Sequence, residues 1–245
     1  MWHSGRQVQE ILGDKMLRLL VVTALVVLFP FVAFAQEPTL KDSFPNGRHE
    51  LRWVSFPYFN RDNLEGARDS KAPDGDNGIG LLKNRNVGGF ASLSYAVTRQ
   101  MDNFYFESMV YCPVTEGGKG PLAGIAFLID PIGGNFYRLV CDFKTNDPTL
   151  NLAYVGLDTK NYPVYLKFWD SKEIPGGIPK ESGWHRIAVK VKGGRATAYW
   201  DLKELKGGPF LVDKIQRGFV GVYANFVGGL GEATTKVDSF LLREE

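Results

Sequence analysis

One alternating stretch, residues 184–201, limits the possible fold of this chain more than any other. It reads WHRIAVKVKGGRATAYWD, and apolar residues occupy every second position on both sides of Gly193-Gly194. Ile187 and Val189 belong to the first run, and Ala198 belongs to the second. A two-residue period on either side of a short glycine turn predicts a β-hairpin with one buried face.

Most of the chain after residue 35 repeats this pattern. Long surface loops are expected at 57–78 and 170–183, which are rich in glycine, proline and charged residues. No stretch keeps a helical period over three turns, so we expect an all-β domain of two antiparallel sheets. The remaining strand-like runs are 42–44, 51–56, 79–82, 90–97, 104–112, 123–129, 136–143, 150–157, 164–169, 210–212, 218–226 and 237–242.

The first 35 residues have the pattern of a removed signal peptide. Lys15 and Arg18 are followed by an apolar run over 19–35, which contains Pro30 and ends in the small-x-small sequence Ala33-Phe34-Ala35. The apolar run is shorter than the roughly 20 residues of a typical transmembrane helix. We therefore expect cleavage between Ala35 and Gln36, with translation starting at Met16.

The remaining residues, 36–245, are expected to form a single domain that is secreted or periplasmic and has no membrane attachment after cleavage. The whole chain carries 29 Lys and Arg against 27 Asp and Glu, a net charge of +2 without a basic stripe, so nucleic acid is not an expected partner. With 3 His and 2 Cys, the chain offers no His-rich or Cys-x-x-Cys zinc site. It also lacks a Gly-x-Ser-x-Gly nucleophile motif.

Three pairs of segments have a family-like pattern: 183–189 with 199–201, 218–223 with 237–240, and 124–127 with 137–139. They resemble paired strands of the concanavalin A-like lectin/glucanase jelly rolls, with laminin-G-like domains and 3-keto-disaccharide hydrolases as the nearest branches. This resemblance covers about residues 41–243 and implies a two-sheet jelly roll that faces a glycan. The Glu-x-Asp-x-x-Glu strand of laminarinase-type hydrolases is absent. Leu128 and Arg138 stand where the keto-disaccharide branch usually carries Arg and Glu.

The resemblance also implies a structural calcium ion near the terminal strands of the domain. Asp42 and Asp238 are in family-like positions for its ligands. No other cofactor is expected.

The central runs supply candidate ligand-binding residues. We expect 104–112, 123–129 and 136–143 to be consecutive neighbours in one sheet, with Phe106 and Leu139 in the core. Alternation then places five residues together on one outer face. Aromatic rings can cover the C–H faces of a sugar while charged groups bind its hydroxyls. These five residues are Tyr105, Glu107, Tyr111, Arg138 and Asp142.

Trp169, which precedes the 170–183 loop, is a sixth candidate for contact with the ligand, with packing at the edge of the sheet as the alternative. The alternative for this face is a solvated sheet surface on which Arg138 forms cross-strand ion pairs with Glu107 or Asp142.

The same strand order places Glu107 and Asp142 two strands apart, at about 10 Å. They are the alternative catalytic residues, although this spacing is wide for a glycosidase and Arg138 would keep both ionised. Cys112 and Cys141 would be equally far apart, beyond the reach of a disulfide, so we expect two buried free thiols.

These patterns favour an exported carbohydrate-binding, lectin-like domain without catalytic residues of its own. The first alternative is a hydrolase or lyase that cleaves an extracellular glycan, with Glu107 or Asp142 in the reaction. The second alternative is a structural or protein-interaction sandwich. The expected partner is a carbohydrate or a glycan surface.

Overall fold

A computed structural model describes residues 39–59, 63–84, 91–117, 120–144, 148–227 and 232–245. The predicted signal peptide lies outside these described residues. Within them, no helix has the length and apolar character needed to cross a bilayer. Two 3-10 turns, η1 (Pro45–Gly47) and η2 (Leu157–Thr159), accompany two β-sheets.

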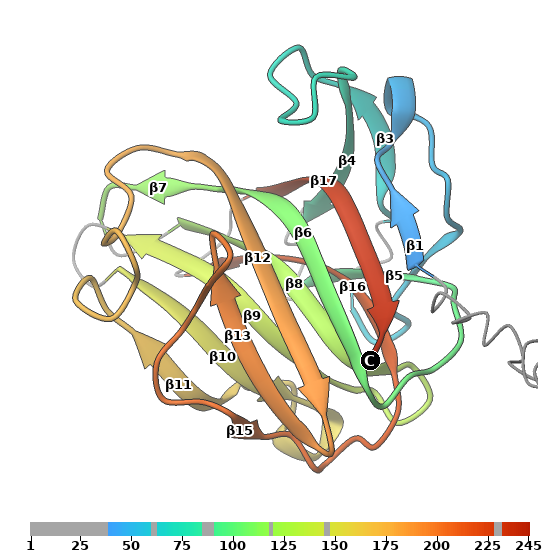
Figure 1. Ribbon diagram of the computed structural model, residues 1–245, viewed down its shortest axis with the longest axis vertical. Coiled ribbons are helices and arrows are strands. Elements are labelled where there is room, and N and C mark those ends of the chain that lie inside the picture. The colour runs from blue at the N-terminus through green and yellow to red at the C-terminus, as the bar shows by residue number, and fades with distance from the viewer. Residues whose placement is uncertain (1–38, 60–62, 85–90, 118–119, 145–147, 228–231) are drawn as a thin grey trace, which may run out of the picture. The chain divides into compact units, whose positions relative to one another are not determined.

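The first sheet carries the predicted hairpin at one side and the chain's last strand near its middle (Figure 1). Its strand order is β14 (Lys203–Glu204), β13 (Arg195–Trp200), β12 (Gly183–Lys192), β6 (Phe104–Cys112), β17 (Ala233–Glu244), β4 (Gly78–Asn84) and β3 (Glu65–Arg68). Two further strands pair off this path, β1 (Thr39–Asp42) with the last part of β17 and β15 (Phe210–Leu211) with β13.

The second sheet forms the other layer of the sandwich, with β8 and β9 behind β6 in the view of Figure 1. Its order is β11 (Val164–Trp169), β10 (Thr149–Val155), β9 (Asn135–Lys144), β8 (Gly120–Asp130), β16 (Phe219–Val227), β5 (Ser92–Ala96) and β2 (Trp53–Ser55). A short strand, β7 (Val114–Thr115), pairs with β9 in parallel, and the other described pairings in both sheets are antiparallel.

The predicted hairpin is confirmed as β12 and β13, with Val189 opposite Ala198. Gly193 and Gly194 both have positive φ, 57° and 69°, as a type I′ turn requires. Residues other than glycine and asparagine rarely adopt that backbone conformation, which explains the Gly-Gly pair.

The space between the sheets is filled by the inward-facing residues that alternation predicts. Phe106 of β6 and Leu139 of β9 are fully buried there, as is Trp200 of β13. Burying one such side chain stabilises the fold by about 1.5–3 kcal/mol. The predicted all-β sandwich and this part of its core are therefore confirmed.

The second sheet is also buried on much of its outer face, which simple alternation does not predict. Val140 and Tyr223 belong to a separate apolar cluster on that face, and Phe56 and Phe59 pack onto it beside Phe136. The Phe56 and Phe136 rings are 5.5 Å apart in an edge-to-face arrangement. The segment after β2 therefore folds over part of the outer face, so this face is not flat.

Of the three central strands, 123–129 and 136–143 are neighbours as predicted, as β8 and β9, but the predicted place of 104–112 beside them is wrong. β6 lies between β12 and β17 in the first sheet, whereas β8 lies between β9 and β16 in the second. The prediction favoured pairing between strands that are close in sequence, but the partners of β6 come from the last part of the chain. The stretch predicted as a loop at 57–78 also contains a strand, β3, which pairs with β4.

The prediction of two free thiols is wrong for the same reason. Cys112 and Cys141 form a disulfide, with their Cα atoms 6.0 Å apart. Each cysteine is on the inward side of its strand, and the two strands belong to different sheets. The sulfurs therefore meet across the core and link the two layers.

Candidate ligand-binding site

A cavity of about 510 Å³ opens on the outer side of the second sheet. This volume is within the usual range for small-ligand sites. We call this cavity the Arg138 pocket. Different elements form its floor and one of its walls. The floor includes Leu122, Arg138 and Tyr223, and the wall before and along β11 includes Tyr162, Pro163 and Tyr165.

Arg138 lies at the bottom of this pocket and is 2% exposed. Its neighbours across β8 and β10 are Ala126 and Ala153, whose small side chains leave room for the guanidinium group. The guanidinium carbon is 4.9 Å from the centre of the Tyr223 ring, a cation–π arrangement. Such a contact contributes about 2 kcal/mol when desolvated, whereas burial of an ion costs several kcal/mol.

Two of the three guanidinium nitrogens of Arg138 have no hydrogen-bond partner among the described residues. The Nε and Nη1 atoms of Arg138 are both buried without an acceptor. Among the described residues that line the pocket, none is acidic. Asp142, on the same side of β9, instead accepts a hydrogen bond of 3.1 Å from Lys144. A buried donor of this kind requires water or a ligand as its partner.

Amide groups near Arg138 add unpaired acceptors. Asn161 lines the pocket, and its Oδ1 atom is buried without a hydrogen-bond donor. Asn151 of β10 is 1% exposed and has the same unpaired oxygen. Asn151 is opposite Val140 of the outer cluster, so it faces the same side of the sheet as Arg138. This side therefore offers both donors and acceptors, which is what a hydroxylated ligand needs.

Exposed aromatic side chains border the pocket along the edge strand β11. Tyr162 is 74% exposed, and Tyr165 and Phe168 are nearly half exposed. The rings of Tyr165 and Phe168 are 4.3 Å apart. Grouped exposed aromatic residues beside a cavity are typical of a binding surface.

The prediction that Trp169 is exposed at the ligand site is wrong. Trp169 is fully buried, and its Nε1 donates a hydrogen bond of 2.8 Å to the carbonyl oxygen of Lys206. The aromatic residues that line the pocket here are Tyr165, from the strand that ends in Trp169, and Tyr162, from the turn before that strand. Tyr162 and Tyr165 were missed because 160–163 reads as a turn and 164–169 as an ordinary strand. An apolar edge strand with aromatic residues on its exposed positions was the available signal.

The predicted single face of five residues is divided between the two sheets. Tyr105, Glu107 and Tyr111 are on β6 and face outward from the first sheet, whereas Arg138 and Asp142 face outward from the second. Their expected association is therefore wrong. The alternative catalytic pair of Glu107 and Asp142 is divided in the same way and cannot act on one substrate.

The β6 residues are paired within the protein. Tyr105 donates a hydrogen bond of 2.6 Å to Glu107, and Nη1 of Arg186 is 3.3 Å from the other Glu107 oxygen. Burial and the bond to Glu107 raise the pKa of Tyr105 above its ordinary value. Arg243 covers the Tyr105 ring at 4.5 Å. This surface matches the alternative of an ion-paired sheet face, with Arg186 in the role expected for Arg138.

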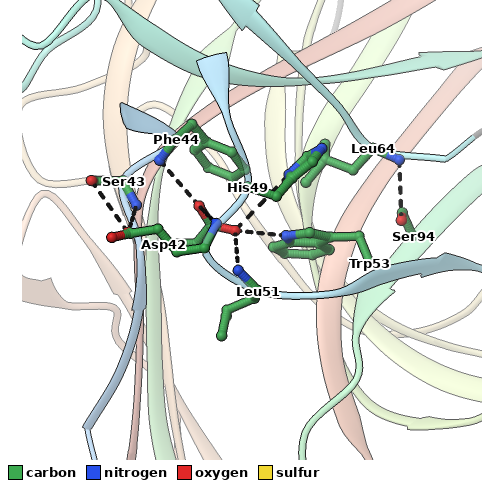
Figure 2. Close-up of polar contacts among 9 residues, drawn as sticks. Asp42, Ser43, Phe44, His49, Leu51, Trp53, Leu64 and Ser94 are labelled. Carbon is green, nitrogen blue, oxygen red and sulfur yellow. Dashed lines mark hydrogen bonds and ion pairs between the residues drawn. The ribbon is translucent and has the colours of Figure 1, made fainter. Parts of the chain in front are cut away.

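Asp42 does not have the surroundings of a metal ligand (Figure 2). Its carboxylate accepts hydrogen bonds from the backbone N–H groups of Phe44, Glu50 and Leu51 and from Nε1 of Trp53. The Trp53 bond is the shortest, at 2.8 Å. N–H donors directed at both oxygens favour a structural role, because they stabilise the carboxylate without a cation.

Asp238 is fully buried on β17 and has a different environment. Burial, with the nearby negative charge of Asp74, raises the pKa of Asp238 to about 7. Its Oδ1 accepts a 2.6 Å hydrogen bond from the N–H of Ser239. Within the described ranges, no group of three or more His, Cys, Asp or Glu residues is arranged to hold a metal ion.

The comparisons with known proteins concern the fold. No protein-family model and no curated protein matches the chain. Among solved structures, the carbohydrate-binding module CBM66 from Bacillus subtilis is 12% identical with a TM-score of 0.50, over 80% of this chain and 98% of that one. The β-glucanase of Bacillus licheniformis is 12% identical with a TM-score of 0.54, over 84% of this chain and 98% of that one.

A glycoside hydrolase family 16 endo-glucanase from Bacteroides ovatus is similar to the same degree. It is 12% identical with a TM-score of 0.52, over 83% of this chain and 99% of that one. With these neighbours and two packed antiparallel sheets, the fold is a concanavalin A-like jelly-roll sandwich, as the sequence resemblance implied.

Proposed function

We propose that this protein binds a carbohydrate in the Arg138 pocket. The observation that carries the proposal is a buried arginine at the bottom of a cavity bordered by exposed tyrosines, with Nε and Nη1 unpaired among the described residues. The binding module and the glucanases with the same fold support a glycan as the ligand class. Arg138 thus keeps the role predicted from the sequence, with new neighbours.

Each part of the pocket has a task in sugar binding. The rings of Tyr162 and Tyr165 provide flat apolar surface for the C–H face of a pyranose. The Asn161 oxygen can accept a hydrogen bond from a hydroxyl group, and the Arg138 guanidinium can donate to a ligand oxygen. The pocket therefore combines an apolar wall with polar groups at its base.

Binding without cleavage fits the described residues better than hydrolysis. A glycosidase needs two carboxyl groups about 5–10 Å apart on either side of the scissile bond. The described lining of the Arg138 pocket includes Asn161 and Asn225 but no carboxyl group. A hydrolase that uses this pocket would need acidic residues from elsewhere in the chain.

We also propose that the domain works outside the cytoplasm. The disulfide between Cys112 and Cys141 suits an oxidising compartment and agrees with the predicted signal peptide. A structural calcium ion stays a prediction, which Asp42 does not support. A thermal-shift measurement with calcium and with a chelator tests it, and an unchanged melting temperature would argue against the ion.

A matched pair of tyrosine variants tests the proposed site. Binding of a panel of neutral and acidic oligosaccharides is measured by calorimetry for the wild type, Tyr165→Ala and Tyr111→Ala. Tyr165→Ala removes part of the pocket wall, so we expect weaker binding. Tyr111→Ala removes a half-buried ring from the other sheet and should leave binding unchanged.

Two results would contradict the proposal. One is the absence of binding to every oligosaccharide in the panel, and the other is a loss of binding in Tyr111→Ala alone. Product analysis of the same mixtures distinguishes binding from cleavage, because a binding protein leaves the oligosaccharides intact.

A further inference from the structure

The charge of the Arg138 pocket indicates more about its ligand than its shape does. A guanidinium group carries a fixed positive charge in proteins. In the pocket it meets the Tyr223 ring and lies between Ala126 and Ala153, none of which carries a negative charge. Among the described lining residues it is the only charged group. Within the described part of the chain, this buried positive charge therefore has no acidic neighbour in the pocket.

We propose that the natural ligand of this pocket is an acidic glycan, with a uronate carboxylate bound to Arg138. This inference rests on the proposed carbohydrate-binding function and specifies its ligand class. A carboxylate neutralises the guanidinium and also accepts its hydrogen bonds, and the two groups match in planar geometry. A neutral sugar supplies only the hydrogen bonds.

The surroundings of Arg138 favour directed hydrogen bonds to the ligand's acidic group over a long-range electrostatic attraction. The Tyr223 ring supports one face of the guanidinium, which limits its rotation. Burial of Nε and Nη1 means that each hydrogen bond to the ligand forms away from bulk water, where a charged bond is strong. The acidic group is thus bound at the bottom of the pocket while Tyr165 contacts the sugar ring at its wall.

No ion-pair network among the residues that the structure describes includes Arg138. Asp142, four residues along β9, hydrogen-bonds to Lys144 and does not reach Arg138 within the described contacts. On the first sheet, by contrast, Arg186 is 3.3 Å from Glu107. Arg186 therefore has a carboxylate partner, whereas none of the described residues supplies one to Arg138.

The test compares three trisaccharides of equal length by calorimetry at fixed ionic strength. They are a uronate trisaccharide, the same trisaccharide with its carboxyl groups reduced to alcohols, and a sulfated neutral trisaccharide. Galacturonate, glucuronate and mannuronate series are each used. We expect the uronate of at least one series to bind about tenfold or more tighter than its reduced form, as for a buried charged hydrogen bond.

Variants assign the preference to the guanidinium group. In Arg138→Gln we expect the uronate affinity to fall to that of the reduced sugar, while the affinity for the reduced sugar changes little. Arg138→Lys keeps the charge without the planar fork and should retain part of the preference. If Arg138→Gln does not fold, Arg138→Lys and the salt dependence of wild-type binding still measure the charged contact.

The outcomes separate the acidic ligand from the proposed function. Equal binding of uronate and reduced trisaccharides would overturn the acidic ligand and leave carbohydrate binding intact. Binding of the sulfated sugar without binding of any uronate would overturn the carboxylate assignment. Failure of every sugar to bind would overturn the proposed function, and the acidic ligand with it.

Discussion

The two outer faces of the sandwich carry similar residue types in different states. On the first sheet, Tyr105, Glu107 and Arg186 satisfy one another through short contacts. On the second, Arg138 is more deeply buried and its donors have no described partner. The comparison teaches that a polar, aromatic face does not by itself mark a site. Unsatisfied groups in a cavity are the better indication.

Each sheet also has a buried ionisable side chain on its outer side, Asp238 in the first and Arg138 in the second. The two respond to burial differently. Asp238 follows the core residue Val237, so it points outward from the first sheet, where Asp74 is near. As an acid, it can lose its charge by binding a proton, which its raised pKa reflects. Arg138 has no such option, and no described residue that lines its pocket is acidic, so we expect a partner from outside to balance its charge.

The largest expected effect concerns the link between the two sheets. Replacing Cys112 and Cys141 together by serine removes the disulfide that joins β6 to β9. We expect the free energy of unfolding to fall by about 2–4 kcal/mol, because the unfolded chain is no longer constrained. Chemical denaturation measures this, and the oxidised wild type should be two hydrogens lighter than its reduced form. If Cys112 and Cys141 both remain free thiols in the wild type under oxidising conditions, the placement of β6 is contradicted.

Replacing the unopposed arginine should change stability in an unusual direction. We expect Arg138→Met in the ligand-free protein to raise the free energy of unfolding by about 1–3 kcal/mol, because it removes a buried charge without a partner. The matched variant Arg186→Met, which breaks the ion pair with Glu107, should lower it by at most about 1 kcal/mol. Urea denaturation compares them. A large loss of stability in Arg138→Met would show that the protein itself compensates this charge.

The buried acid of the first sheet predicts a pH dependence. The folded protein holds the Asp238 proton up to about pH 7, whereas the ordinary pKa is 3.8. Between these values the folded state binds more protons than the unfolded state, so stability contributed by protonated Asp238 decreases as pH rises. We expect Asp238→Asn to weaken this decrease by about 1 kcal/mol or more between pH 5 and 7. Identical pH profiles for the variant and the wild type would contradict a raised pKa.

The smallest effect is expected at Glu107. Glu107→Gln loses an ion pair on a partly exposed face, which changes the free energy of unfolding by about 0–1 kcal/mol. It should also lower the pKa of Tyr105, since a negative neighbour is removed. Ultraviolet titration of tyrosine measures that change. Glycan binding by Glu107→Gln should equal that of the wild type, and a strong loss would move the site to the first sheet.

Local patterns predicted much of the fold. Alternation identified the hairpin of β12 and β13, and it assigned Phe106 and Leu139 to the core. It also placed Arg138 on an outer face, because the period of a strand depends only on its own residues. These features are encoded within one or two neighbouring strands.

Long-range pairing was not available from these patterns. The partners of β6 are β12 and β17, and no periodicity within β6 identifies them. Because the prediction put β6 in the same sheet as β8 and β9, it placed the two cysteines too far apart and put Arg138 on the same face as Tyr105. Trp169 is buried through its contact with the chain at Lys206, which is also distant in sequence. The pocket depends on several such contacts, so only some of its residues were found.

The most direct test of the account is a crystal structure of the protein with the uronate trisaccharide that binds best. We predict a carboxylate oxygen about 3 Å from the Arg138 guanidinium and a sugar ring against Tyr165. A trisaccharide bound instead on the face of Tyr105 and Glu107, or bound in the pocket with its carboxylates directed away from Arg138, would contradict it.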